Sequence, residues 1–231
     1  MKPFQFQNFT INQSKDVFRV GTDGVLLGAL TDVSNSQNIL EVGTGTGLIS
    51  LMLAQRNSKA KITAIDINDA AVELSAENFK ASPFSERLKA VNSDFKNFSA
   101  NQKFDLIVSN PPYFEENPSA KDVLARQKLE LDFSDLIKKS SELISAAGIL
   151  SVIIPFESGG DFENICRKNQ FHLIRKIKIK GIEGSKTKRL ILEFSKTSKP
   201  STETELIIEK SPRQYSDQYL KLTKDFHVFG K

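Results

Sequence analysis

The sequence is poor in cysteine and histidine. Cys166 is the single cysteine, and the 231 residues include only 2 histidines. A lone cysteine excludes an intramolecular disulfide and favours a reducing compartment. Cysteine and histidine form no cluster with the spacing of metal ligands, so we expect a reaction without a metal ion. His172 and His227 are expected to be surface or hairpin residues.

Long hydrophobic runs are also missing. No uninterrupted apolar stretch approaches membrane length, and the N-terminus MKPFQFQNFT has no apolar signal core. We therefore expect a soluble, cytoplasmic protein without membrane contact. Hydrophobic residues make up 39% of the chain, which is ordinary for a globular protein and sufficient for a full core at this length.

Net positive charge is absent from the first part of the chain and concentrated in the last. Residues 1–166 carry 16 basic and 21 acidic side chains, whereas residues 167–231 carry 16 basic and 7 acidic ones. This asymmetry predicts that the C-terminal part binds a polyanion. A solvated lysine face is the alternative explanation.

Strand-like and helix-like segments alternate from residue 39 onward. The runs NILEV, KITAIDI, LKAVNSD, FDLIVSN and GILSVIIP are typical of strands, and the segments between them have helical spacing. The alternation predicts right-handed βαβ units and a parallel sheet covered on both faces. HLIRKIKIK and TKRLILEF are then joined only by GIEGS, which predicts an antiparallel hairpin.

Shorter elements are expected at both ends of the chain. FQFQNFTINQ is typical of an extended segment, and TDGVLLGAL predicts a short helix capped by Thr22 or Asp23. ETELIIEK predicts a strand and SDQYLKLTKDF a helix. We expect a single domain over 1–231, with an N-terminal extension (1–37), a catalytic core (38–196) and a C-terminal strand and helix (197–231).

A glycine-rich loop follows the first strand of the predicted sheet. In LEVGTGTGLIS, Gly43, Gly45 and Gly47 lie where the strand passes into a helix, and glycine lets the backbone approach a ligand closely there. Asp66 ends the next strand, 23 residues after Gly43, where a carboxylate can accept hydrogen bonds from ribose hydroxyls. Together they predict a nucleoside-containing cofactor; a tight turn without a ligand is the alternative.

The spacing of the glycines separates two cofactor classes. The dinucleotide fingerprint G-x-G-x-x-G requires glycine at position 48, where this chain has Leu48. Glu41 precedes the loop and can hold a positively charged amino-acid end, which pyrophosphate cofactors lack. An NAD-dependent oxidoreductase is therefore the disfavoured alternative from a different class.

Polar residues at the ends of neighbouring strands extend the candidate site. Asp94 closes the third strand with Phe95 beside it, and this pair can bind an adenine amino group and cover its ring. A helix or turn cap is the alternative role for Asp94. Glu41, Asp66, Asp94 and Asn110 all fall at or near the carboxyl ends of consecutive strands, where parallel sheets bind ligands.

The stretch DLIVSNPPYF ends the fourth strand with a rigid turn. Pro111 and Pro112 cannot continue a sheet because proline has no N–H. The side-chain carbonyl of Asn110 and the backbone carbonyl of Pro111 are two acceptors that can polarise an exocyclic amine, which is otherwise a poor nucleophile. Tyr113 can stack on the base that carries the amine, and Phe114 can extend that platform.

These residues resemble the class I S-adenosylmethionine-dependent methyltransferases. Asn-Pro-Pro-Tyr is the motif of members that methylate adenine N6, guanine N2 or glutamine amides. The chain is most similar to the bacterial tRNA1(Val) adenine-N6 methyltransferase family, through FRVGTDGVLLGAL, EVGTGTGLISLMLAQR, VSNPPY, Ala125-Arg126 and YSDQYLKLT. One departure is Phe18-Arg19, where methionine and lysine are usual.

The resemblance implies an α/β, Rossmann-like fold with a seven-stranded, mostly parallel sheet and a C-terminal antiparallel hairpin. It implies S-adenosyl-L-methionine as cofactor, S-adenosyl-L-homocysteine as product, and methyl transfer to N6 of adenine 37 beside the anticodon of tRNA1(Val). No metal and no obligate protein partner are implied. The implied catalytic residues are Asn110, Pro111, Pro112 and Tyr113. The implied cofactor-binding residues are Asp23, Glu41, Gly43, Thr44, Gly45, Gly47, Asp66, Ile67, Asp94, Phe95 and Asn110.

An adenine in an anticodon arm must leave its stack to reach such a site, and the RNA backbone around it requires positive charge. The candidate RNA-binding residues are Tyr113, Phe114, Arg126, Lys176, Lys178, Lys180, Lys186, Lys188 and Arg189. We call Lys176, Lys178 and Lys180 the lysine stripe, because alternate strand residues share one face. A solvated strand face is an equally good explanation of the stripe.

Other planar amines are alternative substrates: a release-factor glutamine, guanine N2 or adenine N6 in ribosomal RNA, or adenine in DNA. Release-factor enzymes have a helical domain before the core, and only 38 residues precede Ile39 here. DNA enzymes usually have a separate recognition region, for which this chain has no room. Guanine-N2 enzymes more often have phenylalanine at the position of Tyr113. An inactive RNA-binding module is disfavoured because Asp66, Asn110 and Tyr113 are intact.

Overall fold

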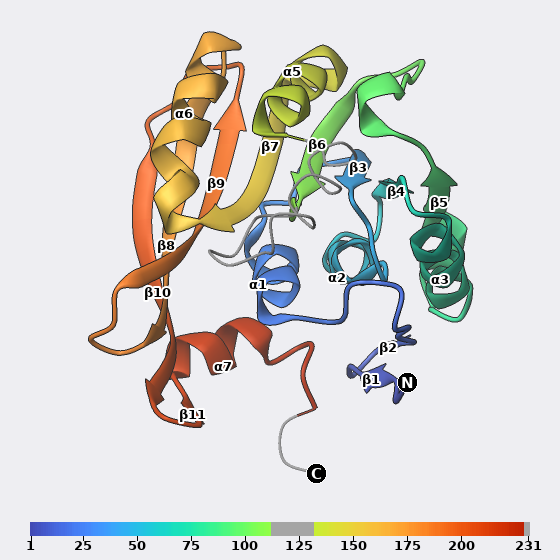
Figure 1. The fold of residues 1–231 in the computed structure, drawn as a ribbon, viewed down its shortest axis with the longest axis vertical. Coiled ribbons are helices and arrows are strands. Elements are labelled where there is room, and N and C mark those ends of the chain that lie inside the picture. Colours follow the sequence, from blue (N-terminus) through green and yellow to red (C-terminus); the bar gives the residue numbers. More distant parts are fainter. Residues whose placement is uncertain (112–131, 229–231) are drawn as a thin grey trace, which may run out of the picture.

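The computed structural model describes residues 1–111 and 132–228. One large sheet forms the centre of the molecule (Figure 1). Its strands are β3 (Asn38–Val42), β4 (Lys61–Asp66), β5 (Leu88–Asn92), β6 (Phe104–Ser109), β7 (Ile144–Pro155), β8 (His172–Ile182), β9 (Thr187–Ser195), β10 (Thr202–Ser211) and β11 (Gln214–Tyr215). They lie in the order β11-β10-β8-β9-β7-β6-β3-β4-β5.

The sheet is parallel where the sequence predicts βαβ units. β3, β4, β5, β6 and β7 pair in parallel, and β9 pairs antiparallel with both β7 and β8. The α/β class and the hairpin are therefore confirmed. The sheet has nine strands, two more than expected, because β10 pairs in parallel with β8 and β11 pairs with β10. The C-terminal strand thus widens the core sheet.

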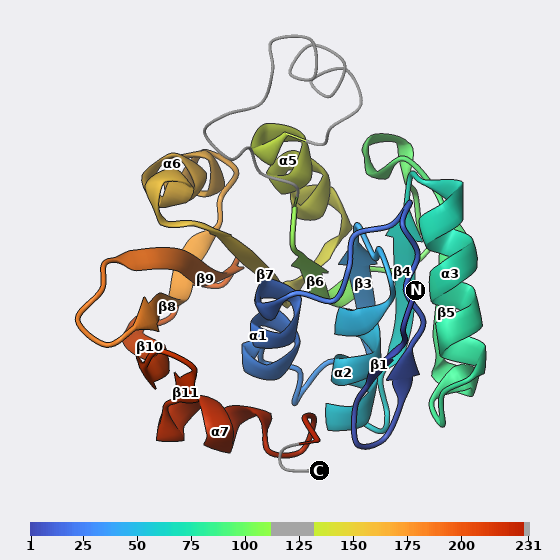
Figure 2. The ribbon, with the colours of Figure 1, turned by 60° about the horizontal axis from the view of Figure 1, so that its bottom comes forward.

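Helices cover both faces of the sheet. The helices are α1 (Thr22–Leu30), α2 (Leu48–Arg56), α3 (Asp69–Lys80), α5 (Phe133–Leu143), α6 (Gly159–Lys168) and α7 (Asp217–Thr223), with the 3-10 turns η1 (Ser85–Arg87), η2 (Phe95–Asn97) and η3 (Phe156–Ser158). In Figure 2, α1, α2 and α7 lie on one side of the sheet and α5 and α6 on the other. Two separate sets of buried apolar residues fill these two interfaces. None of the helices in the described ranges has the length and hydropathy that crossing a membrane requires.

The two ends of the described chain pack against each other. β1 (Phe4–Gln5) and β2 (Thr10–Ile11) form a small antiparallel pair, and Phe6 makes a bridge with His227. The rings of Phe6 and His227 stack, and both Phe6 and Phe226 are buried in one apolar cluster with residues of α1 and α2. His227 is therefore part of this packing.

The start of α1 differs from the expectation. Gly21, rather than Thr22 or Asp23, is the N-terminal cap. The physical reason is a distant partner: Asp23 Oδ2 accepts a hydrogen bond of 2.9 Å from Nε of Arg189. The carboxylate that could have capped the helix is used to join α1 to β9.

Candidate active site at the carboxyl ends of the strands

The carboxyl ends of β3, β4 and β6 meet at one edge of the sheet. Val42 pairs with Ile65 of β4 and with Ser109 of β6, so the residues that follow these strands are neighbours. The hydroxyl of Ser109 also donates to the carbonyl of Val42 at 2.9 Å. The structure therefore brings the glycine loop, Asp66 and Asn110 to the same edge, as the sequence predicts.

The glycine loop needs glycine for two different reasons. Gly43, Gly45 and Gly47 have φ values of 77°, 54° and 81°, a region that other residues rarely adopt. A Cβ on Gly47 would lie 2.5 Å from Cε1 of Phe79 in α3, so packing also requires glycine there. A Cβ on Gly43 would meet nothing within 4 Å. The space beside Gly43 is open to a ligand.

Asp66 supports the loop and remains half-buried. Its Oδ2 accepts from the Gly45 N–H at 2.9 Å, and its Oδ1 accepts from the Asn68 N–H at 3.0 Å. A carboxylate has about four acceptor positions, so further ones remain for ribose hydroxyls. Ile67, which follows directly, is 53% exposed and presents apolar surface beside this carboxylate. The pair has the character of a nucleoside site.

Glu41 is completely buried beneath the loop. Its Oε2 accepts from the Thr44 hydroxyl at 2.9 Å, from the Ser50 N–H at 3.2 Å and from the Ser50 hydroxyl. Its Oε1 is buried and has no partner among the described residues. Burial raises the pKa of Glu41 to about 7. Glu41 therefore holds the loop to the first turn of α2, and its unpartnered oxygen is available to a positive group.

Asp94 and Phe95 have structural partners that the sequence does not show. Asp94 lies two residues beyond β5 and caps η2, accepting from the Lys96 N–H at 2.9 Å and from the Asn97 side chain at 3.2 Å. Its alternative role as a turn cap is therefore present in the structure. Phe95 is only 4% exposed and packs in the core, so its ring does not form an open platform. Ile67, by contrast, is an exposed apolar side chain at this edge.

Asn110 directly follows β6 and carries a hydrogen-bond acceptor that has no partner among the described residues. Its Oδ1 is buried and accepts no hydrogen bond from any described residue. Burying such an oxygen without a partner costs stability, by about 1–3 kcal/mol. Pro111, which follows, is buried and fixes the chain as it leaves the strand. Pro112, Tyr113, Phe114 and Arg126 lie outside the described residues.

The lysine stripe is ion-paired. Nζ of Lys176 lies 2.5 Å from a carboxylate oxygen of Glu163, and the corresponding distances are 2.5 Å for Lys178 with Glu203 and 2.9 Å for Lys180 with Glu205. The stripe thus presents less positive charge than its sequence suggests. Lys186 and Lys188 are exposed, and Arg189 forms the ion pair with Asp23.

Asn78, a residue not predicted from the sequence, joins the N-terminal segment to the glycine loop. Its side chain exchanges two hydrogen bonds with the backbone of Asn12, at 2.8 and 3.1 Å, and donates a third to the Thr46 carbonyl at 2.9 Å. Asn78 is fully buried on α3. The sequence signal for this role is that Asn78 is a polar residue on the buried face of the amphipathic helix α3.

The N-terminal segment also borders the site. Phe18 is 88% exposed, and its carbonyl oxygen lies 4.0 Å from where a Cβ on Gly45 would be. The Asn68 side chain donates to the carbonyl of Asp16 at 3.4 Å. The unusual Phe18-Arg19 pair therefore lies beside the glycine loop.

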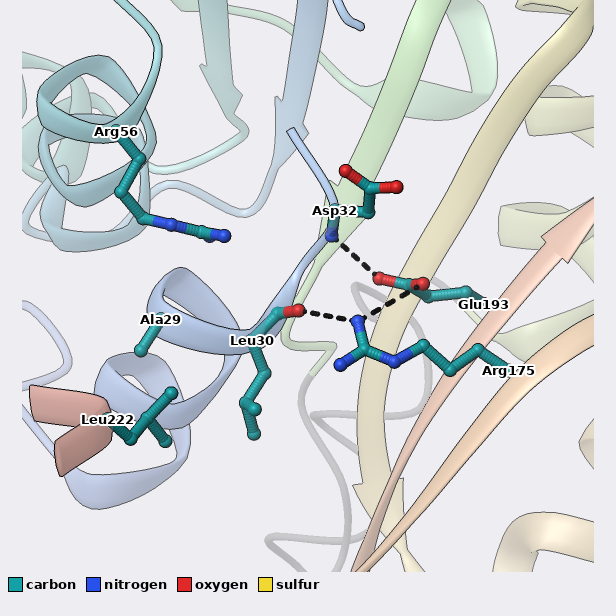
Figure 3. Close-up of a pocket in the computed structure, with 7 residues that line it drawn as sticks. All are labelled: Ala29, Leu30, Asp32, Arg56, Arg175, Glu193 and Leu222. Carbon is teal, nitrogen blue, oxygen red and sulfur yellow. Dashed lines mark hydrogen bonds and ion pairs between the residues drawn. The ribbon is translucent and has the colours of Figure 1, made fainter. Parts of the chain in front are cut away.

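A separate cavity of about 410 Å³ lies at the C-terminal end of α1 (Figure 3). Glu193 accepts from the Asp32 N–H at 2.9 Å and pairs with Arg175 at 3.6 Å, and Arg175 donates to the Leu30 carbonyl at 2.8 Å. Arg56 donates to two further carbonyls of this region. The charged groups of the cavity hold β8 and β9 to α1, away from the glycine loop.

Comparison with known proteins supports a methyltransferase fold. Residues 10–159 match the model of the methyltransferase small domain family. A protein of Flavobacteriaceae bacterium (strain 3519-10), named tRNA1(Val) (adenine(37)-N6)-methyltransferase, is 56% identical over 99% of this chain and 100% of its own. A Bacteroides fragilis (strain ATCC 25285) protein with the same name is 39% identical over 97% of both chains.

Solved structures are similar in fold alone. A predicted O-methyltransferase from Agrobacterium tumefaciens has a TM-score of 0.71 at 20% identity, covering 88% of this chain and 96% of that one. The ribosomal protein L11 methylase from Lactobacillus delbrueckii subsp. bulgaricus has a TM-score of 0.58 at 18% identity, covering 79% and 82%.

Proposed function

This chain belongs to the methyltransferase small domain family, and on that premise we propose that it methylates N6 of adenine 37 in tRNA1(Val), with S-adenosyl-L-methionine as methyl donor. Relatives with this name support the substrate, since their alignments with this chain cover at least 97% of both chains. The proposal places the enzyme in the cytoplasm with its tRNA.

One observation carries the proposal: a buried, unpartnered acceptor lies next to a nucleoside-type loop. Asn110 Oδ1 has no partner among the described residues, and β6 pairs directly with β3, from which the glycine loop starts. An oxygen kept in this state fits an amine that arrives with the substrate. Asn110 also directly follows the strand next to the one from which the glycine loop starts, so a bound amine would lie beside the proposed donor site.

The residues of the loop fit the methyl donor. The open space at Gly43 admits a ligand close to the backbone, Asp66 has acceptor positions for ribose, and Ile67 offers apolar surface to a base. The unpartnered Oε1 of Glu41 suits the positive amino-acid end. The donor supplies an electrophilic methyl group, and this chain's own residues supply position and polarisation.

Asn110 and Pro111 act on the target amine. The Asn110 side-chain carbonyl and the Pro111 backbone carbonyl accept its two N–H groups and draw the nitrogen toward sp3 geometry, which frees its lone pair for attack. Tyr113 stacks on the adenine in this proposal. The methylated amine is acidic and loses its extra proton to water, so no strong base is needed.

Methylation of another planar amine is the second candidate, because the Asn-Pro-Pro-Tyr chemistry is the same for adenine and guanine. The names of the relatives favour tRNA adenine. An NAD-dependent oxidoreductase is disfavoured by Leu48. Calorimetric titration with S-adenosylhomocysteine and with NAD separates these two cofactor classes, and we expect binding of the first alone.

The direct test is methylation of a tRNA1(Val) transcript with a labelled methyl donor, followed by nucleoside mass spectrometry. We expect N6-methyladenosine in the transcript and none in a matched transcript that carries guanosine at position 37. Methylation of both transcripts would refute the assignment of the position. Transfer to neither would refute tRNA1(Val) as the substrate.

A further inference from the structure

The turns that follow β8 and β10 carry exposed cations. Lys186 and Lys188 are exposed at the β8–β9 turn, and Lys210 and Arg213 are exposed at the β10–β11 turn. In the part of the chain that the structure describes, no ion pair involves any of these four side chains. Their charge is available to a ligand.

The charge balance of these turns differs from that of the lysine stripe. Residues 182–188 and 209–215 together contain four basic and two acidic side chains. The two acidic residues are Glu183, which is exposed, and Glu209, which accepts from the Arg213 backbone N–H at 3.2 Å. The stripe has three lysines that pair with three glutamates. The turns therefore keep a net positive charge that the stripe lacks.

The two turns are neighbours. The Glu183 N–H donates to the Glu209 carbonyl at 2.9 Å, and Ile182 at the end of β8 pairs with Glu209 of β10. β8 and β10 are parallel to each other, and β9 is antiparallel to both β8 and β7. β8 and β10 therefore end at the same edge of the sheet as β6, which leads to Asn110.

The distance from the reaction site suits a polyanion that extends beyond the target base. In the strand order, β9 is two places and β10 four places from β6. At a spacing of about 4.8 Å per strand, the sideways offset of the turns from Asn110 is roughly 10 and 19 Å. The turns also lie further along the strand direction, because Val152 of β7 pairs with Ser109 whereas Pro155, three residues later, pairs with Arg189. Several phosphates of one strand lie within such a distance, since they follow one another at about 3.4 Å along a duplex axis.

An aromatic ring lies beside the cations. Tyr215 in β11 is 43% exposed and stacks on Tyr219 of α7, with ring centroids 4.8 Å apart and an angle of 29° between the planes. Nucleotides that are not base-paired bind to surfaces that combine cations for phosphate with aromatic rings for the bases.

We propose that Lys186, Lys188, Lys210, Arg213 and Tyr215, which we call the turn surface, bind the RNA strand that flanks the target adenine. This inference rests on the proposed function and adds to it the surface that holds the substrate. Lysines contact phosphates, and the Tyr215 ring stacks on an unpaired base. The paired lysines of the stripe contribute less.

The test compares two variants that each lose three positive charges. The turn variant is Lys186→Gln, Lys188→Gln, Lys210→Gln. The control variant is Lys59→Gln, Lys61→Gln, Lys80→Gln, whose residues are exposed and lie at or before the start of β4 and at the end of α3. Affinity for a tRNA1(Val) transcript is measured over a range of salt concentrations, and S-adenosylhomocysteine binding reports on the fold.

We expect the turn variant to bind tRNA about tenfold more weakly at physiological salt. The slope of log affinity against log salt should fall by about 2, because each phosphate contact contributes about 0.7–0.9. The control variant should stay within about twofold of the parent. S-adenosylhomocysteine affinity should be unchanged in both.

Equal tRNA affinity and equal salt slope in the turn variant and the parent would overturn the turn surface. An equal loss in the control variant would also overturn it, because the effect would then be one of net charge. A parent protein that neither binds nor methylates tRNA would instead refute the proposed function itself, so the two failures are distinguishable.

Discussion

At the scale of single residues, Glu41 is a carboxyl group whose burial opposes its charge. Burial raises the pKa of Glu41 to about 7, against about 4.5 for an exposed glutamate. Between these two values the folded protein keeps a proton that the unfolded chain has released. The contribution of Glu41 to stability is therefore present below about pH 4.5 and is lost as the pH rises toward 7.

We expect a Glu41→Gln variant to lack this pH dependence. From pH 5 to pH 8, the free energy of unfolding of the parent should fall relative to that of the variant by roughly 2.5 kcal/mol, since one pKa unit corresponds to about 1.4 kcal/mol. Urea unfolding of both proteins at several pH values measures the difference. Parallel stability curves would show that Glu41 is ionised throughout.

Asn78 is expected to stabilise the fold through its three side-chain hydrogen bonds. An Asn78→Ala substitution would leave the buried carbonyl of Thr46 and two partly buried backbone groups of Asn12 without these partners. We expect a loss of about 3 kcal/mol in unfolding free energy, and weaker binding of S-adenosylhomocysteine because the loop loses its support. Glu77→Ala, at the exposed neighbouring position of α3, should change stability by less than about 0.5 kcal/mol. Similar stability of the two variants would contradict this role for Asn78.

At the scale of elements, two glycines of the loop have different surroundings: Gly47 packs against α3, whereas Gly43 faces open space. Gly47→Ala places a Cβ against Phe79 in a backbone conformation with φ of 81°. Gly43→Ala has a similar φ of 77° but meets no protein atom within 4 Å. The two positions share the strain of a positive φ, and they differ in what surrounds the added methyl group.

We expect Gly47→Ala to lower the unfolding free energy by about 3 kcal/mol, and Gly43→Ala by about 1 kcal/mol. Gly43→Ala should nevertheless weaken S-adenosylhomocysteine binding at least tenfold, because its methyl group occupies the ligand's space. Thermal unfolding and calorimetry measure the two effects. Unchanged ligand affinity in Gly43→Ala would exclude this loop face as the donor site.

The elements themselves follow largely from local sequence. The glycine loop, the strand that ends at Asp66 and the β8–β9 hairpin are predicted because periodicity and turn residues act over a few positions. The cap of α1 is not predictable in this way, since the partner of Asp23 is Arg189, far along the chain. The same holds for Phe95, whose burial depends on core residues from other elements.

At the scale of the whole molecule, the sequence predicts an excess of positive charge in the last part of the chain. It does not predict which of these cations pair with carboxylates. The sheet pairs β8 with β10 and thereby sets the lysines of one strand beside glutamates of the other. Local patterns predict a strand at ETELIIEK, but they do not predict its parallel pairing with β8, because the two strands lie far apart in the sequence. Two of the three ion pairs of the lysine stripe therefore follow from the added strand β10, and the third joins Lys176 to Glu163 of α6.

The arrangement of the whole sheet also explains why a costly acceptor is kept at Asn110. In the proposed function the glycine loop holds the methyl donor and Asn110 the target amine, which requires β3 and β6 to lie side by side. The two strands are neighbours in the sheet. Since Asn110 Oδ1 is buried without a described partner, its removal should not lower stability. A residue that adds no stability and lies at the reaction edge is expected to serve the reaction.

The central claim is that Asn110 accepts a hydrogen bond from the adenine amine. The most direct measurement is the single-turnover rate of methyl transfer to tRNA1(Val) by Asn110→Ala. We expect a rate at least 100-fold below the parent, with equal or higher unfolding free energy. Transfer at the parental rate would contradict the account.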